Sequence, residues 1–162
     1  MTPGAIIDML HILSGTVTFF LGALQFIRYI RENFIAFHRL TGKCYILCVL
    51  LSSPTAFFIS FRSPLILAAA GTAIQSALWL ITTLFAWRSI MKKDIIKHSQ
   101  WMLRSYALVL TAPLLRLCIV FLKYGAGIDY QANFNFYYPL FVWLGFLPLV
   151  LAEFYIYSRR TK

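Results

Sequence analysis

Three histidines offer most of the chemistry that this sequence could support. His38 and His98 each stand at the start of a long apolar segment, and each has an arginine nearby, Arg39 and Arg104 respectively. Two imidazoles from two neighbouring helices are the axial ligands that helical bundles offer to a b-type haem. The arginines would neutralise the haem propionates. The pattern therefore predicts one haem b near the cytoplasmic face, with His38 and His98 as the iron ligands.

Other side chains near these histidines fit the same hypothesis. Trp101 and Tyr45 would supply flat apolar walls for a haem. Glu153 lies within the last apolar segment, where an ionised side chain at the bilayer centre costs about 2.5–3.5 kcal/mol. We therefore expect its carboxylate either to relay protons or to pair with one of the arginines predicted on the same side, Arg39, Arg104 or Arg159.

Simpler interpretations of the histidines stay open. Both could lie at the headgroup level and hydrogen-bond lipid phosphate or a helix end. A quinone site or a site for another metal would use the same two side chains. His11 should lie most of a bilayer thickness away from them, so a site joining all three histidines is not expected. Asp8 or His11 is instead expected to pair with Arg116 in an outer polar layer.

The elements that position these residues follow from composition. The chain has 162 residues, 60% of them hydrophobic and 12% charged, with a mean hydropathy of +0.75. Soluble domains are nearer half apolar and a quarter charged, so a soluble enzyme is excluded and the lipid bilayer is the expected partner. The net charge of +10 would suggest nucleic acid in a soluble protein. Here the basic residues lie between apolar segments, and no nucleic-acid partner is expected.

Helices are the expected form of the apolar segments, because a bilayer leaves no water to satisfy an open backbone. We predict one all-α domain over residues 1–162, a multi-pass bundle of five transmembrane helices at approximately 8–28, 40–61, 64–87, 99–123 and 135–158. Twelve of the fifteen Lys and Arg residues lie in the first loop, the third loop and the C-terminal tail. That bias predicts a cytoplasmic C-terminus and an outside N-terminus in a cell inner membrane.

Other features favour a function without catalysis. The sequence contains no nucleophile triad, no phosphate-binding loop and no glycosidase-type carboxylate pair. Any enzymatic activity would therefore be that of a membrane oxidoreductase or electron-transfer component with a quinone or a protein redox partner. Mid-span glutamines (Gln25 and Gln75) and kinking prolines (Pro54, Pro113, Pro139 and Pro148) suggest a cavity. The alternative is thus a small-solute or lipid carrier, or an accessory subunit of a larger complex. The sequence does not set the oligomeric state.

Several blocks of the sequence resemble one membrane family. They are His11 with Gly15, the run 22–26 (GALQF), the run 38–45 (HRLTGKCY) and the run 94–107 (DIIKHSQWMLRSYA). Together they resemble a prokaryotic family catalogued as domain of unknown function twenty-three-oh-six, over nearly the whole chain. The resemblance implies a multi-span fold without an assigned activity. It also implies a family pattern that includes His11, His38, Arg39, His98, Trp101, Arg104 and Glu153.

A looser resemblance is architectural. The predicted bundle is similar to cytochrome b561-type and ferric reductase membrane domains, which hold haem between helices through histidine pairs. Those proteins use four histidines, whereas this chain has three. The resemblance therefore implies at most one ordinary haem with two histidine ligands, which is too few for stepwise electron transfer across the bilayer through two such haems.

Overall fold

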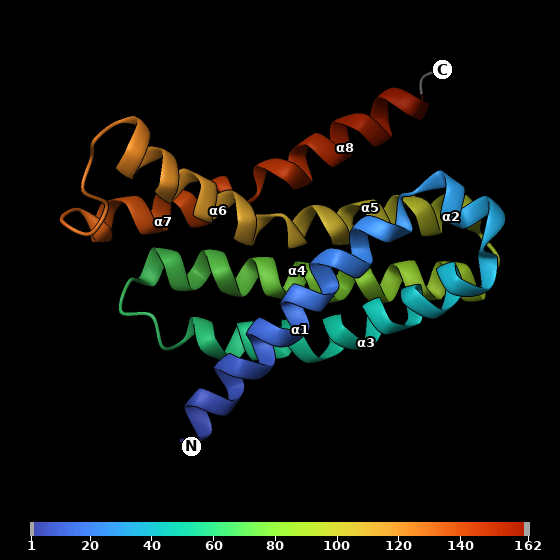
Figure 1. The fold of residues 1–162 in the computed structure, drawn as a ribbon, viewed down its shortest axis with the longest axis horizontal. Helices are drawn as coiled ribbons and strands as arrows, with labels where there is room; N and C mark the ends of the chain where they lie inside the picture. The colour runs from blue at the N-terminus through green and yellow to red at the C-terminus, as the bar shows by residue number, and fades with distance from the viewer. Residues whose placement is uncertain (1, 161–162) are drawn as a thin grey trace.

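The computed structural model describes residues 2–160, and its regular structure is helical (Figure 1). In chain order the elements are α1 (Pro3–Gln25), α2 (Arg28–Asn33), α3 (Ile35–Ser60), α4 (Ile66–Met91), α5 (Ile95–Val109), α6 (Thr111–Val120), the π-helical turn η1 (Phe121–Gly125), α7 (Phe134–Leu144) and α8 (Leu147–Arg160). Lys162, which was counted in predicting the orientation, lies outside the described residues.

Five helical segments of the described chain are long and apolar enough to cross a membrane. They are Pro3–Gln25, Ile35–Ser60, Ile66–Met91, Ile95–Gly125 and Phe134–Arg159. The prediction of an all-helical protein with five spans is confirmed. Large apolar side chains cover the outside of the bundle, with exposed fractions of 82% for Ile66 and 72% for Phe154. Such a surface suits lipid rather than water.

Two helices, α1 and α5, begin earlier than predicted because a polar cap, rather than the apolar run, sets the start. α1 begins at Pro3, five residues earlier than expected, since the Thr2 hydroxyl accepts a hydrogen bond from the Ala5 N–H at 3.4 Å. α5 begins at Ile95 because the Asp94 carboxylate accepts from the Lys97 N–H at 3.0 Å. Both are standard N-terminal caps. The short helix α2 was predicted as loop.

Two of the five spans are broken, and the breaks lie together. α5 ends before Leu110, and Pro113 follows in the first turn of α6. α7 ends at Leu144, and Pro148 follows in the first turn of α8. A proline cannot donate to the carbonyl four residues earlier, so the helix before it opens. The Thr111 hydroxyl donates to the Gly145 carbonyl at 2.9 Å and joins the two breaks.

The other two mid-span prolines do not interrupt their helices. Pro54 lies inside α3 and Pro139 inside α7. The two glutamines predicted to lie mid-span both connect helices, although only Gln75 is mid-helix and Gln25 is the last residue of α1. The Gln75 amide donates to the Val142 carbonyl at 2.6 Å, next to the break between α7 and α8. The Gln25 amide donates to the Thr41 hydroxyl at 2.8 Å. Both glutamines therefore have the structural role of interhelical hydrogen bonding.

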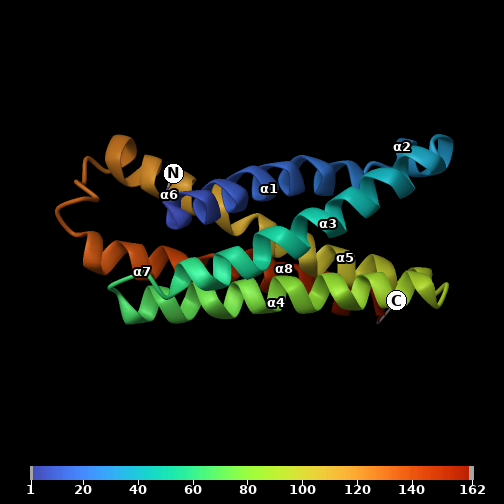
Figure 2. The ribbon, with the colours of Figure 1, turned by 90° about the horizontal axis from the view of Figure 1, so that it is seen from below.

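The bundle core lies where α3, α4 and α5 meet. Tyr45, Val49, Trp79, Met102 and Leu108 form its buried centre. α1 packs along α3, α7 packs against α4, and α8 packs against α5. Figures 1 and 2 show α3 and α5 starting at the same end of the molecule, near α2 and the turn from α4 to α5. We call this the basic end, because it gathers Arg28, Arg31, Arg39, Lys43, Arg88, Lys92, Lys93 and Lys97.

Candidate functional site

The two candidate haem ligands lie in corresponding places on two parallel helices. His38 is seven residues before Tyr45 in α3, and His98 is seven residues before Ser105 in α5. Seven residues are about two helical turns, so each histidine shares a face with the residue that follows it. The Tyr45 hydroxyl and the Ser105 hydroxyl are 2.7 Å apart in the core. His38 and His98 therefore lie in line with Tyr45 and Ser105 on α3 and α5, about 10 Å nearer the basic end than those two residues. We call the region between these two pairs the histidine seam.

His98 is held in one orientation by the neighbouring helix. Its Nδ1 lies 2.9 Å from the carbonyl oxygen of Ala86 in α4. A carbonyl only accepts hydrogen bonds, so Nδ1 donates the proton and the lone pair of a neutral ring is on Nε2. Histidines that bind metals are commonly oriented by such a bond from the other ring nitrogen.

His38 has a buried nitrogen without a partner. Its Nδ1 is shielded from solvent and makes no hydrogen bond within the described residues. His38 and His98 lie close enough for their charges to interact. Buried polar atoms are nearly always hydrogen-bonded, so an unsatisfied one requires an explanation. Trp79 Nε1 is also buried and has no close hydrogen-bond partner in the described part of the chain, but it lies in the core beside the Tyr45 hydroxyl.

Tyr45 belongs to a hydroxyl chain in the core. Its side chain is fully buried, and its hydroxyl bonds to Ser105. Ser105 in turn lies 2.7 Å from the Thr83 hydroxyl of α4, which also donates to the Trp79 carbonyl at 2.8 Å. Three helices are thus joined through one serine oxygen. Tyr45 is therefore a structural residue at the base of the histidine seam. Tyr45 follows His38 by seven residues and Ser105 follows His98 by seven, and this equal spacing is the sequence signal for the Tyr45–Ser105 pair.

Replacing Ser105 with Ala should destabilise the bundle. The change removes the shared partner of the Tyr45 and Thr83 hydroxyls, and a buried hydroxyl left unsatisfied costs roughly 1–3 kcal/mol. We expect a lower midpoint of thermal unfolding in detergent. Ser99→Ala in the same helix is the control, because Ser99 is exposed. Equal midpoints for the two variants would contradict this role for Ser105.

Arg104 forms a bidentate ion pair with Glu153. Its Nε and Nη2 donate to the two carboxylate oxygens at 2.5 and 2.9 Å, which ties α5 to α8. The guanidinium also lies 4.5 Å from the centre of the Trp101 ring, and that ring packs on Phe85 at 4.8 Å. Six residues separate Arg104 from His98, which places it roughly 120° around the helix. The pairing expected for Glu153 is thus present with Arg104.

These contacts change the roles expected for two haem-site residues. Arg104 is not a free counter-charge for a propionate, because Glu153 already neutralises it. Trp101 contacts both the Phe85 ring and the Arg104 guanidinium, so its ring already has partners within the bundle. Arg39, exposed at the basic end beside His38, is the remaining candidate counter-charge.

The outer polar residues form different pairs from those expected. Asp8 pairs with Arg62 at 2.7 Å, which joins the start of α1 to the end of α3. Arg116 is exposed on α6 and donates to the Ala112 carbonyl of its own helix at 3.1 Å. The predicted pairing of Arg116 with Asp8 or His11 is therefore wrong. The reason is tertiary: α1 packs on α3, whereas α6 packs on α7.

His11 is used within the bundle. Its Nδ1 lies 3.0 Å from both the carbonyl oxygen and the hydroxyl of Ser52 in α3. Ser52 is fourteen residues beyond His38, about 21 Å along the helix. His11 therefore links α1 to α3 far from the His38 and His98 pair. Among the described residues, no three His, Cys, Asp or Glu side chains lie close enough together to hold a metal ion.

The comparisons with known proteins agree with this architecture. A family model described as "Predicted membrane protein (DUF2306)" matches residues 9–156. No curated protein and no solved structure matches the chain. The match includes all three histidines and the helix breaks at Leu110 and Gly145. The chain, an integral membrane protein with five apolar helices, belongs to the DUF2306 family.

Proposed function

We propose that this membrane protein is a one-electron transfer component that holds a single b-type haem through His38 and His98. The observation that supports the proposal most directly is the buried Nδ1 of His38, which lacks a hydrogen bond beside a second imidazole. Two such imidazoles on neighbouring helices are the donor set of a low-spin haem.

The chain's own residues would prepare this site. The Ala86 carbonyl keeps the proton on Nδ1 of His98 and leaves the Nε2 lone pair available. Tyr45 and Ser105 join α3 to α5 two turns away, which fixes the helix spacing at the base of the seam. Arg39 would balance the negative charge of the propionates at the membrane surface. When bound, the haem iron supplies reversible one-electron transfer.

The proposal includes an orientation. The basic end would face the cytoplasm of a cell inner membrane, because short loops rich in Lys and Arg are retained on that side. The histidine pair lies close to the basic end, because each histidine is three residues after the first residue of its helix. Electrons would therefore enter or leave from the cytoplasmic side, with a soluble protein or a membrane quinone as the partner.

A reduced-minus-oxidised visible spectrum tests the proposal. The protein is purified in mild detergent from haem-replete cells, and haem and iron are quantified per chain. We expect sharp b-type bands at one haem per chain. A protein that stays colourless after haem supplementation would overturn the haem assignment. In that case, quinone in an organic extract of the protein would assign the same two imidazoles to a quinone, and its absence would favour a carrier or accessory subunit.

A further inference from the structure

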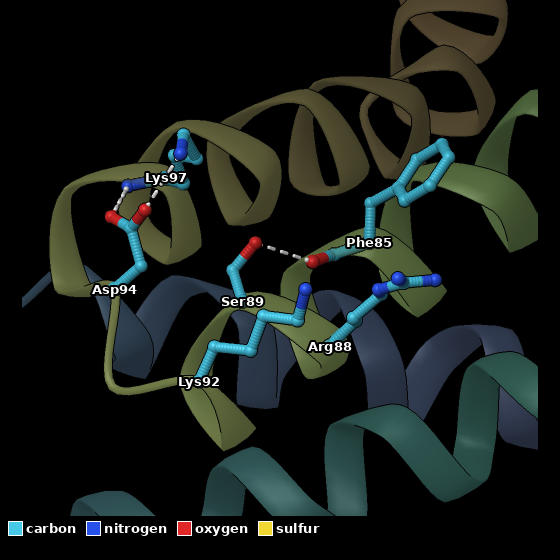
Figure 3. Close-up of a pocket in the computed structure, with 6 residues that line it drawn as sticks. All are labelled: Phe85, Arg88, Ser89, Lys92, Asp94 and Lys97. Carbon is cyan, nitrogen blue, oxygen red and sulfur yellow. Dashed lines mark hydrogen bonds and ion pairs between the residues drawn. The ribbon is translucent and has the colours of Figure 1, made fainter.

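A second site opens at the basic end, outside the histidine seam. The last turns of α4 and the first turn of α5 enclose a pocket of about 190 Å³, lined by Phe85, Arg88, Ser89, Lys92, Asp94 and Lys97 (Figure 3). We propose that this pocket binds the phosphodiester headgroup of an anionic phospholipid. The proposal does not depend on haem binding.

The pocket carries an excess of positive charge. Asp94 is the one carboxylate that lines the pocket, and both of its oxygens already have partners in Lys97. The Lys97 ammonium lies 2.9 Å from Oδ2, and the Lys97 backbone N–H donates to Oδ1 at 3.0 Å. These hydrogen bonds, the backbone one foremost, hold the pKa of Asp94 below its usual range, so it is ionised at neutral pH. Within the described residues no ion pair joins Arg88 or Lys92 to a carboxylate.

The arrangement of donors suits a phosphate group. Arg88 lies in the last turn of α4 and Lys92, four residues later, is the C-cap of the same helix, so the two side chains start from the same side of it. The Ser89 hydroxyl donates to the Phe85 carbonyl at 2.7 Å, as Figure 3 shows, so its proton is taken and the hydrogen bonds to a phosphate would come from Arg88 and Lys92. A guanidinium and an ammonium at the same pocket offer several charge-assisted hydrogen bonds to phosphate oxygens.

The depth of the pocket points to a lipid rather than to free phosphate. α4 has 26 residues and is about 39 Å long, longer than the roughly 30 Å hydrocarbon core. Its last turn, with Arg88, therefore lies at the headgroup level. Phe85 lies about one turn deeper and packs against Trp101. Cations near the surface with an aromatic ring below them match a headgroup and the start of its acyl chains. Basic pockets between transmembrane helices are known sites for anionic headgroups.

Native mass spectrometry in detergent tests the proposal, with phosphatidylglycerol as the probe and phosphatidylcholine as the zwitterionic comparison. We expect one phosphatidylglycerol to be retained per chain in preference to phosphatidylcholine. The double variant Arg88→Gln/Lys92→Gln should bind phosphatidylglycerol roughly 30-fold more weakly, because each lost hydrogen bond to the phosphate contributes about a fivefold factor. The control Arg31→Gln/Lys43→Gln removes the same charge from exposed positions at the same end and should keep the affinity.

Three results would overturn the proposal. Equal weakening by both double variants would show that diffuse charge attracts the lipid. Unchanged binding in Arg88→Gln/Lys92→Gln would remove these two residues from the site. Displacement of the lipid by submillimolar inorganic phosphate would assign the pocket to free phosphate. A circular dichroism spectrum equal to that of the unchanged protein would show that loss of binding in the pocket variant does not come from misfolding.

Discussion

Substituting Ala for His38 is expected to abolish the haem spectrum, and His98→Ala is expected to do the same. Each variant removes one of two axial ligands, and a haem held by a single imidazole loses its low-spin bands and most of its affinity. The expected haem content falls from about one per chain to a small fraction. The measurement is the pyridine haemochrome assay together with the reduced-minus-oxidised spectrum.

His11→Ala is the matched control for the histidine variants. His11 lies in a membrane-spanning helix, as His38 and His98 do, but its ring bonds to Ser52. This variant should keep full haem. Free imidazole should also restore low-spin bands to His38→Gly, since the added ring can enter the space that the side chain leaves. Full haem retention by His38→Ala would contradict the assignment, as would equal loss in His11→Ala.

Among the glycines of α1, substituting Ala for Gly22 is expected to lower the free energy of unfolding most. A Cβ at Gly22 would overlap the Tyr106 ring of α5 and would lie 2.9 Å from Cε2 of Tyr45 in α3. The Tyr106 hydroxyl donates to the Phe19 carbonyl of α1 at 3.3 Å, so α1 cannot move away from α5 without losing that hydrogen bond. Overpacking of this kind costs roughly 1–3 kcal/mol. Small residues at such contacts let membrane helices approach closely.

Thermal unfolding in detergent, followed by size-exclusion chromatography, checks the Gly22 prediction. Gly4→Ala in the same helix is the control, because its Cβ would have ordinary contacts with Arg62 at 3.5 Å and beyond. The control should unfold at the same temperature as the unchanged protein. Tyr106→Leu should partly rescue Gly22→Ala, since the shorter side chain makes room for the methyl group. Matching midpoints for Gly4→Ala and Gly22→Ala would show that the close contact is unimportant.

The histidine seam illustrates how far sequence reasoning reaches. His38 and His98 could be paired in advance because each begins an apolar segment of the same direction. The contacts of the side chains around the two histidines could not be predicted. Arg104 was expected to serve a cofactor, but it lies on the face of α5 that meets α8, where Glu153 takes both of its donors. Which face of a helix meets which neighbour depends on packing between helices that are far apart in sequence.

The outer polar residues Asp8 and Arg116 also show that packing between helices decides which side chains pair. Asp8 and Arg116 are the type of pair that membrane burial favours, yet α1 runs along α3 and brings Asp8 to Arg62 instead. Breaks were predicted at all mid-span prolines, because proline removes a helical N–H. They occur at Pro113 and Pro148, whereas α3 and α7 continue through Pro54 and Pro139. That the two breaks meet, through Thr111 and Gly145, was not foreseeable from either segment.

The sequence by itself determined the class of the protein and the number of its spans. Apolar runs of this length have one stable form in a membrane, because hydrocarbon leaves the backbone polar groups no partner outside the helix. The tertiary structure alone decided which polar side chains meet. The buried nitrogen of His38, the carbonyl that orients His98 and the pocket at Arg88 each depend on contacts between different helices. Apolar contacts with lipid favour no helix face over another, so close packing and interhelical hydrogen bonds select the arrangement.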